Sequence, residues 1–458
     1  MSSFLLLHGL GALLVSAAAG ACLLLLPRLG GAKVVLAAFL VAAAVYPRPV
    51  LGTVGENYVG IAPARFQLAT YSLVLLFGVV MALGRTRQNG SLIALFLLYA
   101  AYCSLVSWGS YGVETAGLAQ LSFGLGGLVF GQFIGRKLVH GVDFRRYFAR
   151  TILACACLQT VFAVMQMAGL FATRADARTA AYVSGRASGT LDHPGTLGKV
   201  MLFLLVLALP LSADDDRDVR RYARFAAACS AISLVLSGSR ADSLAAVVLV
   251  TCWGVAQGHS RSLARRLAMP TLGAATAVAF LALFWTRIQS DPEGGARQHF
   301  MRVAKELLPH HLWIGVGPNA YVAAASPLDA LTADGWPVHN TFMLAAVELG
   351  LVGAVLYFMP VALTMLRACR HAFASGQHKF YARAQLCLVP GLLIVAWTGW
   401  GLLGGAILPL WFFTCGCLGA AGRGTEGDRS KQLVASRSLS ALPSRQQSVE
   451  STRSKAVI

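Results

Sequence analysis

Residues 339–366 read HNTFMLAAVELGLVGAVLYFMPVALTML, an apolar run that contains a single charged side chain, Glu348. A helix rises about 1.5 Å per residue, so a bilayer core of about 30 Å is crossed by roughly 20 apolar residues. Of the 458 residues in the chain, 57% are hydrophobic and only 12% are charged, which is too little charge for the surface of a soluble domain of this length. The sequence therefore predicts an all-α integral membrane protein.

Apolar stretches of comparable length recur along the chain and predict twelve or thirteen membrane-spanning helices. Two are marginal, because 33–46 is short and 113–135 is rich in glycine and alanine; if one fails to span, the total is twelve. The first stretch is expected to remain in the mature protein, since it has no basic segment before it and no clear cleavage site after it. The predicted spans are 4–26, 33–46, 66–84, 91–110, 113–135, 147–171, 196–213, 223–238, 241–257, 270–285, 339–366, 384–400 and 404–420.

Basic residues gather on one side of this predicted topology. Short loops that stay in the cytoplasm are enriched in Lys and Arg, so that side is predicted to be cytoplasmic. The net charge of +19 then follows from topology and needs no nucleic-acid partner. The long polar connections 172–195 and 286–338 face the outside, while 423–458 is a disordered cytoplasmic tail after a membrane domain of residues 1–422. The basic clusters are Arg85 and Arg87; Arg136, Lys137, Arg145, Arg146 and Arg150; Arg217, Arg220, Arg221 and Arg224; Arg261, Arg265 and Arg266; Arg367, Arg370, Lys379 and Arg383; and the tail.

Two patterns that are typical of metal sites are assigned to packing and surface roles. Cys415 and Cys417 lie in an apolar helix with no partner pair nearby, which favours small packing residues over metal ligands. The run DDDRD at 214–218 resembles the metal-binding aspartates of soluble nucleotide-sugar transferases. It falls in a short cytoplasmic loop, so a solvated turn is favoured. The sequence predicts no metal site and no cofactor.

Cations on the outer side are informative, because each costs roughly 3 kcal/mol near the membrane unless it has a partner or a use. The segment SGSRAD (237–242) joins two apolar spans, so Arg240 lies at the outer face in a tight hairpin. Arg240 either snorkels or pairs with Asp242, or it binds an anion. The outer cations are Arg48, Arg65, Arg174, Arg178, Arg186, Lys199, Arg240, Arg287, Arg297, Arg302 and Lys305.

The loop SGRASGTLDHPGTLG (184–198) carries Arg186 and His193 directly before a span. Glycine-rich backbone and the positive end of the following helix dipole are suited to an anion such as phosphate. For His193, an ordinary turn before a helix that begins at proline is an equally good interpretation.

The second outer loop contains GGARQHFMRVAKELLPHHLWIGVGPNAYV (294–322) and predicts an amphipathic helix on the outer membrane face. Such a helix presents its cations to a lipid headgroup. Its apolar stripe consists of Phe300, Val303, Ala304, Leu307 and Leu308, and the cations off the stripe are Arg297, Arg302 and Lys305.

The helix that begins at His339 is predicted to have a small-residue face below the imidazole. At 100° per residue, Ala346, Gly350 and Gly353 lie near the azimuth of the histidine, which permits close helix contact or a groove for a lipid chain. Glu348 points to the opposite side, about 13 Å deeper, so it is not an acid–base partner of His339.

Four motifs in the part of the chain from about 150 to 420 resemble those of the O-antigen ligase superfamily of polytopic glycosyltransferases. This superfamily includes O-antigen polymerases and protein O-oligosaccharyltransferases. The motifs are RASGTLDHPGTLG (186–198), SGSR (237–240), GGARQHFMRVAKELLPHHLWIGVGPNAY (294–321) and HN followed nine residues later by GLVG (339–353). The sequence departs from the family at Gly195, where family members often have asparagine.

The resemblance implies a GT-C-like helical fold in the bacterial inner membrane, with the active site on the periplasmic face and the C-terminus in the cytoplasm. It also implies metal-independent, inverting transfer of a glycan from undecaprenyl diphosphate to lipid A-core. His339 would be the general base that activates the acceptor hydroxyl. Arg186, Arg240 and Arg297 would hold the diphosphate. Asn340, Arg302, Lys305 and His193 would support the site.

Two other functions remain open. An O-antigen polymerase, which joins undecaprenyl-linked repeats, needs the same donor site and base; the spacing after His339 and Asn340 resembles the ligase signature more closely. A flippase or transporter for lipid-linked glycans predicts charges in helix centres and repeat symmetry, and the sequence has neither.

Overall fold

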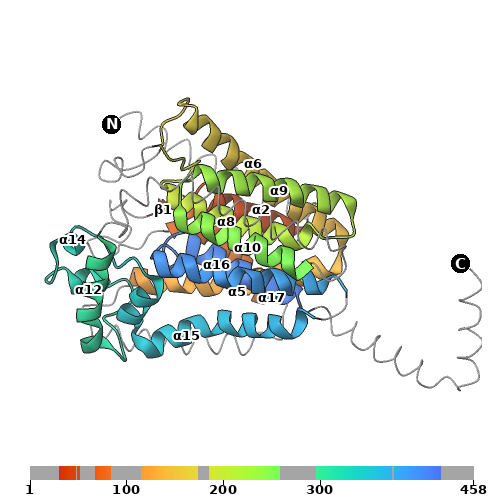
Figure 1. Ribbon diagram of the computed structural model, residues 1–458. Coiled ribbons are helices and arrows are strands. Elements are labelled where there is room, and N and C mark those ends of the chain that lie inside the picture. The colour runs from red at the N-terminus through yellow and green to blue at the C-terminus, as the bar shows by residue number, and fades with distance from the viewer. Residues whose placement is uncertain are drawn as a thin grey trace, which may run out of the picture. The chain divides into compact units, whose positions relative to one another are not determined.

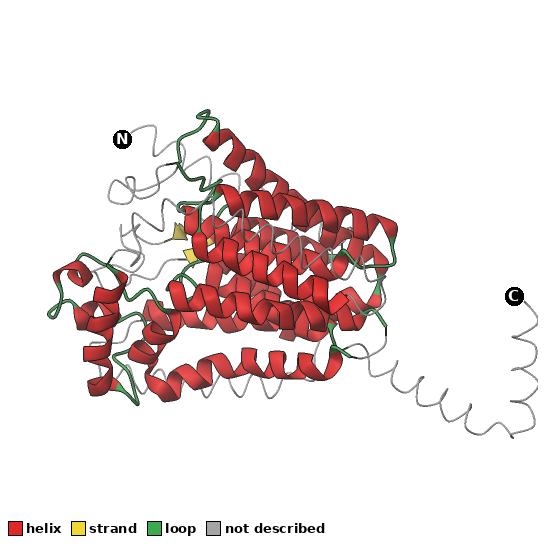
Figure 2. Ribbon diagram, in the orientation of Figure 1, coloured by secondary structure: helices red, strands yellow, loops and turns green. Residues whose placement is uncertain are grey.

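The computed structural model describes residues 30–47, 49–51, 68–83, 115–173, 185–257, 296–373 and 376–423. Within these ranges the chain is helical apart from one short antiparallel pair of strands, β1 (Pro49–Leu51) and β2 (Leu68–Ala69), and the long helices run side by side (Figures 1 and 2). The predicted spans 4–26, 91–110 and 270–285, and residues 424–458 of the predicted tail, lie outside the described residues.

A helix occupies every predicted span inside the described ranges. The helices are α2 (Gly31–Ala44), α3 (Thr70–Leu83), α5 (Thr115–His140), α6 (Val142–Met167), α8 (Pro194–Leu211), α9 (Arg217–Leu236), α10 (Arg240–Gln257), α15 (Thr341–His371), α16 (His378–Thr398) and α17 (Ile407–Ala421). The outer loop adds α12 (Arg297–Leu307), the 3-10 helix η3 (Leu308–His311), α13 (Tyr321–Ala325) and α14 (Ala330–Ala333).

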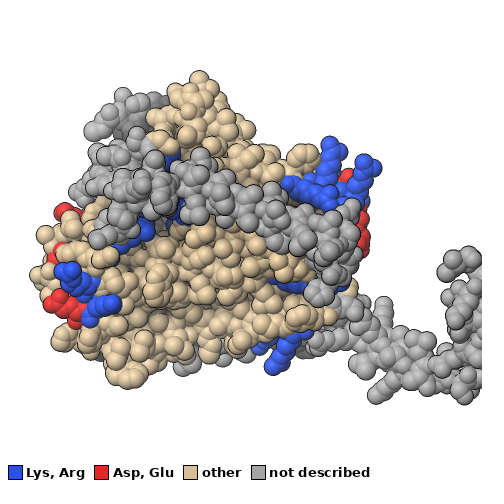
Figure 3. Space-filling view, in the orientation of Figure 1, with Lys and Arg blue, Asp and Glu red and all other residues tan. Residues whose placement is uncertain are grey.

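Several of the described helices have the composition of membrane spans, and four also have the length. Among those described, α6, α8, α15 and α16 are long and apolar enough to cross a bilayer, and α2, α3 and α17 are shorter apolar helices. In the face shown in Figure 3, charged side chains gather toward the two ends of the helices and the surface between them is largely uncharged. The prediction of an all-α integral membrane protein is confirmed. The number of spans stays a prediction, because three of the predicted stretches are not described.

The glycines that made 113–135 a marginal span serve close packing of α5 against α17. A Cβ atom at Gly127, Gly131 or Gly135 would meet the carbonyl oxygen of Pro409, Phe413 or Cys417, respectively. Glycines spaced four apart lie on one helix face, and without side chains they let two backbones approach closely, which is a common way to associate helices in a membrane.

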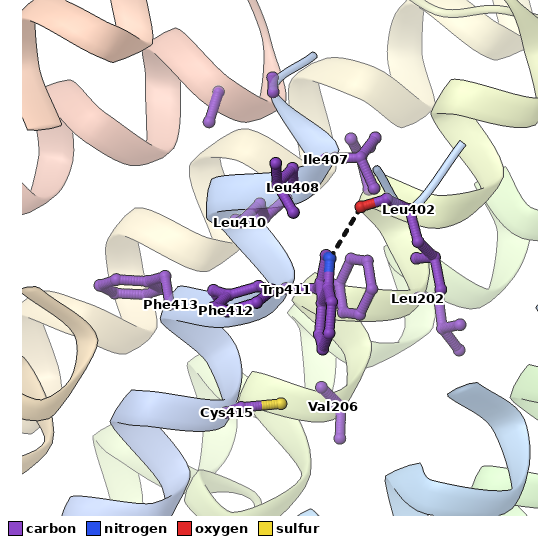
Figure 4. Packing of buried hydrophobic residues seen from close by; sticks show 14 of the residues in the cluster. Leu202, Val206, Leu402, Ile407, Leu408, Leu410, Trp411, Phe412, Phe413 and Cys415 are labelled. Carbon is purple, nitrogen blue, oxygen red and sulfur yellow. Dashed lines mark hydrogen bonds between the residues drawn. The ribbon is translucent and has the colours of Figure 1, made fainter. Parts of the chain in front are cut away.

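The inner side of α17 is completely covered by protein. Trp411, which is 3% exposed, donates its indole N–H to the carbonyl of Leu402 at 2.8 Å and packs beside Leu202 and Val206 of α8 (Figure 4). Burial of an aromatic side chain with its polar atom satisfied is favourable. Cys415 and Cys417 are both fully buried here, as their predicted packing role requires.

One end of the helix bundle is rich in arginine, as the charge pattern predicts. Arg145 and Arg146, in the first turn of α6, lie 2.7 Å and 2.6 Å from carboxylates of Asp214 and Asp216 in the turn before α9. The interpretation of 214–218 as a solvated turn is wrong for Asp214, which is 2% exposed. These aspartates join the ends of two helices, because an arginine and a carboxylate form strong charge-assisted contacts.

The opposite end carries the outer loop, where α12 and α14 lie near the start of α15 (Figure 1). The predicted amphipathic helix is confirmed: its buried residues are Phe300, Val303, Ala304 and Leu307, and its cations Arg297, Arg302 and Lys305 are exposed. That the helix lies on the outer membrane face stays a prediction. The stripe is covered by protein, because the Phe300 ring packs on His339 and the others join the main core.

A break at Gly350 interrupts α15. Gly350 has φ 66° and ψ 171°, and the chain bends into a second helical segment after it. The backbone groups released by the break bind the GVG segment of the outer loop. Val316 N and Gly317 N donate to the carbonyls of Val347 and Glu348, both at 2.9 Å, and Leu351 N donates to the carbonyl of Leu312 at 2.8 Å. The predicted continuous small face below His339 is therefore wrong, since the helical angle does not carry across Gly350.

Candidate functional site

His339 lies immediately before α15 and is held in one orientation. Its Nδ1 is 3.0 Å from the carbonyl oxygen of Pro337. A carbonyl oxygen only accepts, so Nδ1 carries the proton and the lone pair of the neutral ring is on Nε2. The ring stacks on Phe300 of α12, with centroids 5.5 Å apart and planes 16° from parallel. The contacts thus fix both the tautomer and the plane of the imidazole.

The surroundings of His339 favour its neutral form. Burial first and the positive charge of Arg297 second lower the pKa of His339 to about 4; the hydrogen bond to Pro337 opposes them, and the charge of Lys199 adds the smallest of these effects. At neutral pH the ring is unprotonated, so Nε2 can accept a proton. An anion bound between these cations would raise the pKa again, since it would stabilise the imidazolium.

The loop that carries Arg186 is fixed against the turn between α9 and α10. Arg186 Nε donates to the carbonyl of Ser237 at 2.9 Å, and Ala187 N donates to the carbonyl of Leu236 at 3.0 Å. From the other side, Gln166 of α6 accepts from the N–H groups of residues 188 and 189 at 2.9 and 2.8 Å. These hydrogen bonds to the backbone therefore position Arg186 next to the α9–α10 turn, which is followed by Arg240.

A buried carboxylate lies one turn further along the same hairpin. Asp242, in the first turn of α10, is 1% exposed and accepts from Ser239 Oγ at 2.6 Å. Its Oδ2 also lies 3.8 Å from Nζ of Lys199, which belongs to α8. This pair connects the Arg240 hairpin to the start of α8, and the charge of Lys199 also contributes to the lowered pKa of His339.

A family model described as O-Antigen ligase matches residues 225–358. This segment of the chain is similar to the O-antigen ligase superfamily. The matched segment includes Arg240, Arg297 and His339. The match supports a glycosyltransferase-like enzyme of the ligase or polymerase type in general. None of the curated proteins compared with the chain matches it.

Two of the residues expected to support the site are helix caps. Asn340 Oδ1 accepts from Met343 N at 3.0 Å at the start of α15, and Nδ1 of His193 accepts from Gly195 N at 3.0 Å at the start of α8. Side-chain acceptors at these positions satisfy N–H groups that the first helical turn leaves unpaired. Both residues thus shape the site through the helices that they begin.

The cations expected on α12 separate into two groups. All three are exposed, but Arg297 begins the helix and its charge lowers the pKa of His339, whereas Arg302 and Lys305 lie further along the helix, away from the buried stripe. Of the three arginines that the motifs select, Arg186 bonds to the α9–α10 turn and Arg240 begins the helix after it. The charge of the third, Arg297, lowers the pKa of His339. Lys199 is one of the predicted outer cations, but it lies outside the four motifs. It relates to both groups, through Asp242 at the hairpin and through its charge on His339.

Proposed function

We propose that the protein is an O-antigen ligase, which transfers a glycan from undecaprenyl diphosphate to a sugar of lipid A-core on the periplasmic face of the bacterial inner membrane. The observation that carries the proposal is the oriented His339, whose unprotonated Nε2 lies in the field of Arg297 and Lys199. It is supported by the position of the site, at the end of the helices opposite the arginine-rich turns.

The reaction follows from these groups. Nε2 of His339 accepts the proton of the acceptor hydroxyl while that oxygen attacks the anomeric carbon of the donor. The bond from this carbon to the diphosphate oxygen breaks on the opposite face, so the configuration inverts and undecaprenyl diphosphate leaves with the electron pair. Arg186, Arg240 and Arg297 neutralise the charge that develops on the leaving group. With this charge balanced by guanidinium groups, the transfer is proposed to be metal-independent.

The pH dependence gives a first check on the base. The groups that face His339 are Arg297 from α12, Lys199 from α8, the Phe300 ring and the Pro337 carbonyl. The neutral ring is the active form, so the rate falls as the pH drops through the pKa of His339. We expect this acid limb at higher pH in kcat than in kcat/KM for the donor, because the bound diphosphate raises the pKa.

The decisive experiment compares His339→Ala with His310→Ala in a strain that lacks the chromosomal gene. His310 is an exposed histidine of η3 and serves as the matched control. We expect His310→Ala to restore the full lipopolysaccharide ladder and His339→Ala to leave long polymer on the carrier lipid. A full ladder with His339→Ala contradicts the role of the base. A deletion strain whose lipopolysaccharide carries a single repeat identifies a polymerase instead.

A further inference from the structure

We propose that Lys199 is a further substrate-binding residue of this site, that its ammonium contacts the diphosphate of the lipid-linked donor, and that the buried Asp242 positions it. The inference rests on the proposed function, because it names a contact of the same donor. It begins from the position of Lys199, whose Nζ lies 3.8 Å from Asp242 at the hairpin and whose charge also contributes to the lowered pKa of His339.

The ammonium of Lys199 is held at the N-terminal end of α8 and uses only part of its capacity to donate hydrogen bonds. Nζ donates to the carbonyl of Gly195 at 3.2 Å, and the side chain is 15% exposed. An ammonium has three N–H donors, and the 3.8 Å to Asp242 is too long for a hydrogen bond. Within the part of the chain that the structure describes, two donors of Lys199 therefore have no protein acceptor. Phosphate oxygens are suitable acceptors for such donors.

Glycines leave the room that the lysine and the carboxylate occupy. A Cβ atom at Gly401 would lie 3.1 Å from Cε and 3.4 Å from Nζ of Lys199. A Cβ atom at Gly198 would lie 3.0 Å from Cβ and Cγ of Asp242 and closer still to its Oδ2. The pair thus sits in a space bounded by backbone on both sides, which limits the positions that the ammonium can take.

The contacts of Asp242 are less favourable than those expected in an ion pair that serves stability alone. Asp242 is 1% exposed, yet its Oδ1 has no hydrogen-bond partner among the described residues. The attraction within a buried ion pair offsets the free energy of desolvating its two charges only when the geometry is good and all hydrogen bonds are made. In the pair of Lys199 and Asp242, neither condition is met. Together with Arg297, Lys199 leaves positive charge around His339. A bound diphosphate would balance that charge and supply the acceptors that are missing.

The test separates a structural lysine from one that binds substrate. The single variant Lys199→Met leaves Asp242 without its cation, so it can lower stability whichever role the lysine has. The double variant Lys199→Met/Asp242→Asn removes both charges and should recover the melting temperature. Lys379→Ala, at the arginine-rich end, is the control for loss of a lysine elsewhere.

Binding of undecaprenyl diphosphate to the full-length protein in detergent is measured for each variant, with inorganic diphosphate as competitor. We expect the folded double variant to bind the lipid about 10- to 100-fold more weakly, as for loss of a hydrogen bond to a charged group. We also expect Lys199→Arg to retain more binding and Lys379→Ala to bind normally. Competition by inorganic diphosphate at concentrations similar to the lipid would assign the site to free diphosphate.

Normal lipid binding by the folded double variant overturns the inference, even if His339→Ala abolishes transfer. Conversely, a large loss of binding in the double variant, combined with full transfer by His339→Ala, keeps the inference and contradicts the proposed base. The failure of one proposal can thus be distinguished from the failure of the other.

Discussion

The break in α15 makes Gly350 the position where a single methyl group should do most damage. At φ 66° and ψ 171° the residue occupies a backbone region that is almost restricted to glycine. The Cβ atom of alanine would also meet the backbone carbonyl of Trp313, which no side-chain rotation can move away. Gly350→Ala therefore has to change the backbone of α15, of the outer loop, or of both.

The size of the effect follows from these two terms. Backbone strain of this type costs about 1–3 kcal/mol. If the loop separates from the break, three backbone hydrogen bonds are lost, each contributing about 0.5–1.5 kcal/mol. The expected destabilisation is therefore about 3–7 kcal/mol. Transfer should fall as well, because the same loop connects α12, whose Phe300 stacks on His339, to α15.

The measurement is the melting temperature of the purified protein in detergent, with two matched glycines as controls. Gly169 also has a positive φ, 74°, but no atom lies within 4 Å of its added Cβ, so Gly169→Ala should lose only about 1–2 kcal/mol. Gly141 has φ −160° and open space, so Gly141→Ala should lose only about 0.5–1 kcal/mol, because alanine is a poorer N-cap than glycine. If Gly350→Ala melts like Gly169→Ala, the loop does not pack on the break.

Two capping residues give further tests. His193→Ala should lower stability by about 1 kcal/mol, whereas His193→Asn keeps a good cap and should keep both the melting temperature and transfer; normal melting with lost transfer in His193→Asn would assign the imidazole a role in the reaction. Asp216→Asn preserves the cap of α9 but weakens the contact with Arg146, so it should melt between the native protein and Asp216→Ala. The hydrogen bond to Arg146 lowers the pKa of Asp216 to about 2, so the advantage of native protein over Asp216→Asn should disappear as the pH falls from about 4 toward 2. An advantage that persists at pH 2 would contradict this ion pair.

The sequence predicted the helices well because apolar runs of membrane length are a strong signal. It placed their ends less well where polar residues continue a helix. The helix α9 begins at Arg217, six residues before the predicted span, because Asp216 caps it and its first turns are charged. Hydropathy does not detect such turns, although Asp216 itself is a capping signal that the sequence contains.

The parts that the sequence did not predict depend on contacts between distant segments. Gly350 and Gly353 fit a helical period, and only the docked GVG segment reveals that Gly350 is a break. The amphipathic pattern of α12 predicts that one face of the helix is covered. The pattern is the same for a face covered by lipid and a face covered by protein, so it does not distinguish them. In the candidate site, His339 and the three arginines were found through motifs. Lys199 was not selected, because the sequence does not show its contact with Asp242, which is 43 residues away in the sequence and 3.8 Å away in space.

The candidate site combines two sets of helices that are each held by their own contacts. His339 and Arg297 belong to the first, in which α12 and α15 are connected twice, through the Phe300 stack and through the loop at Gly350. Arg186, Arg240 and Lys199 belong to the second, which is built on α8 and the α9–α10 turn. The proposed base therefore comes from the first set, and most of the proposed diphosphate contacts come from the second. The substitution Gly350→Ala should accordingly reduce transfer more than it reduces binding of undecaprenyl diphosphate. The double variant Lys199→Met/Asp242→Asn should reduce both.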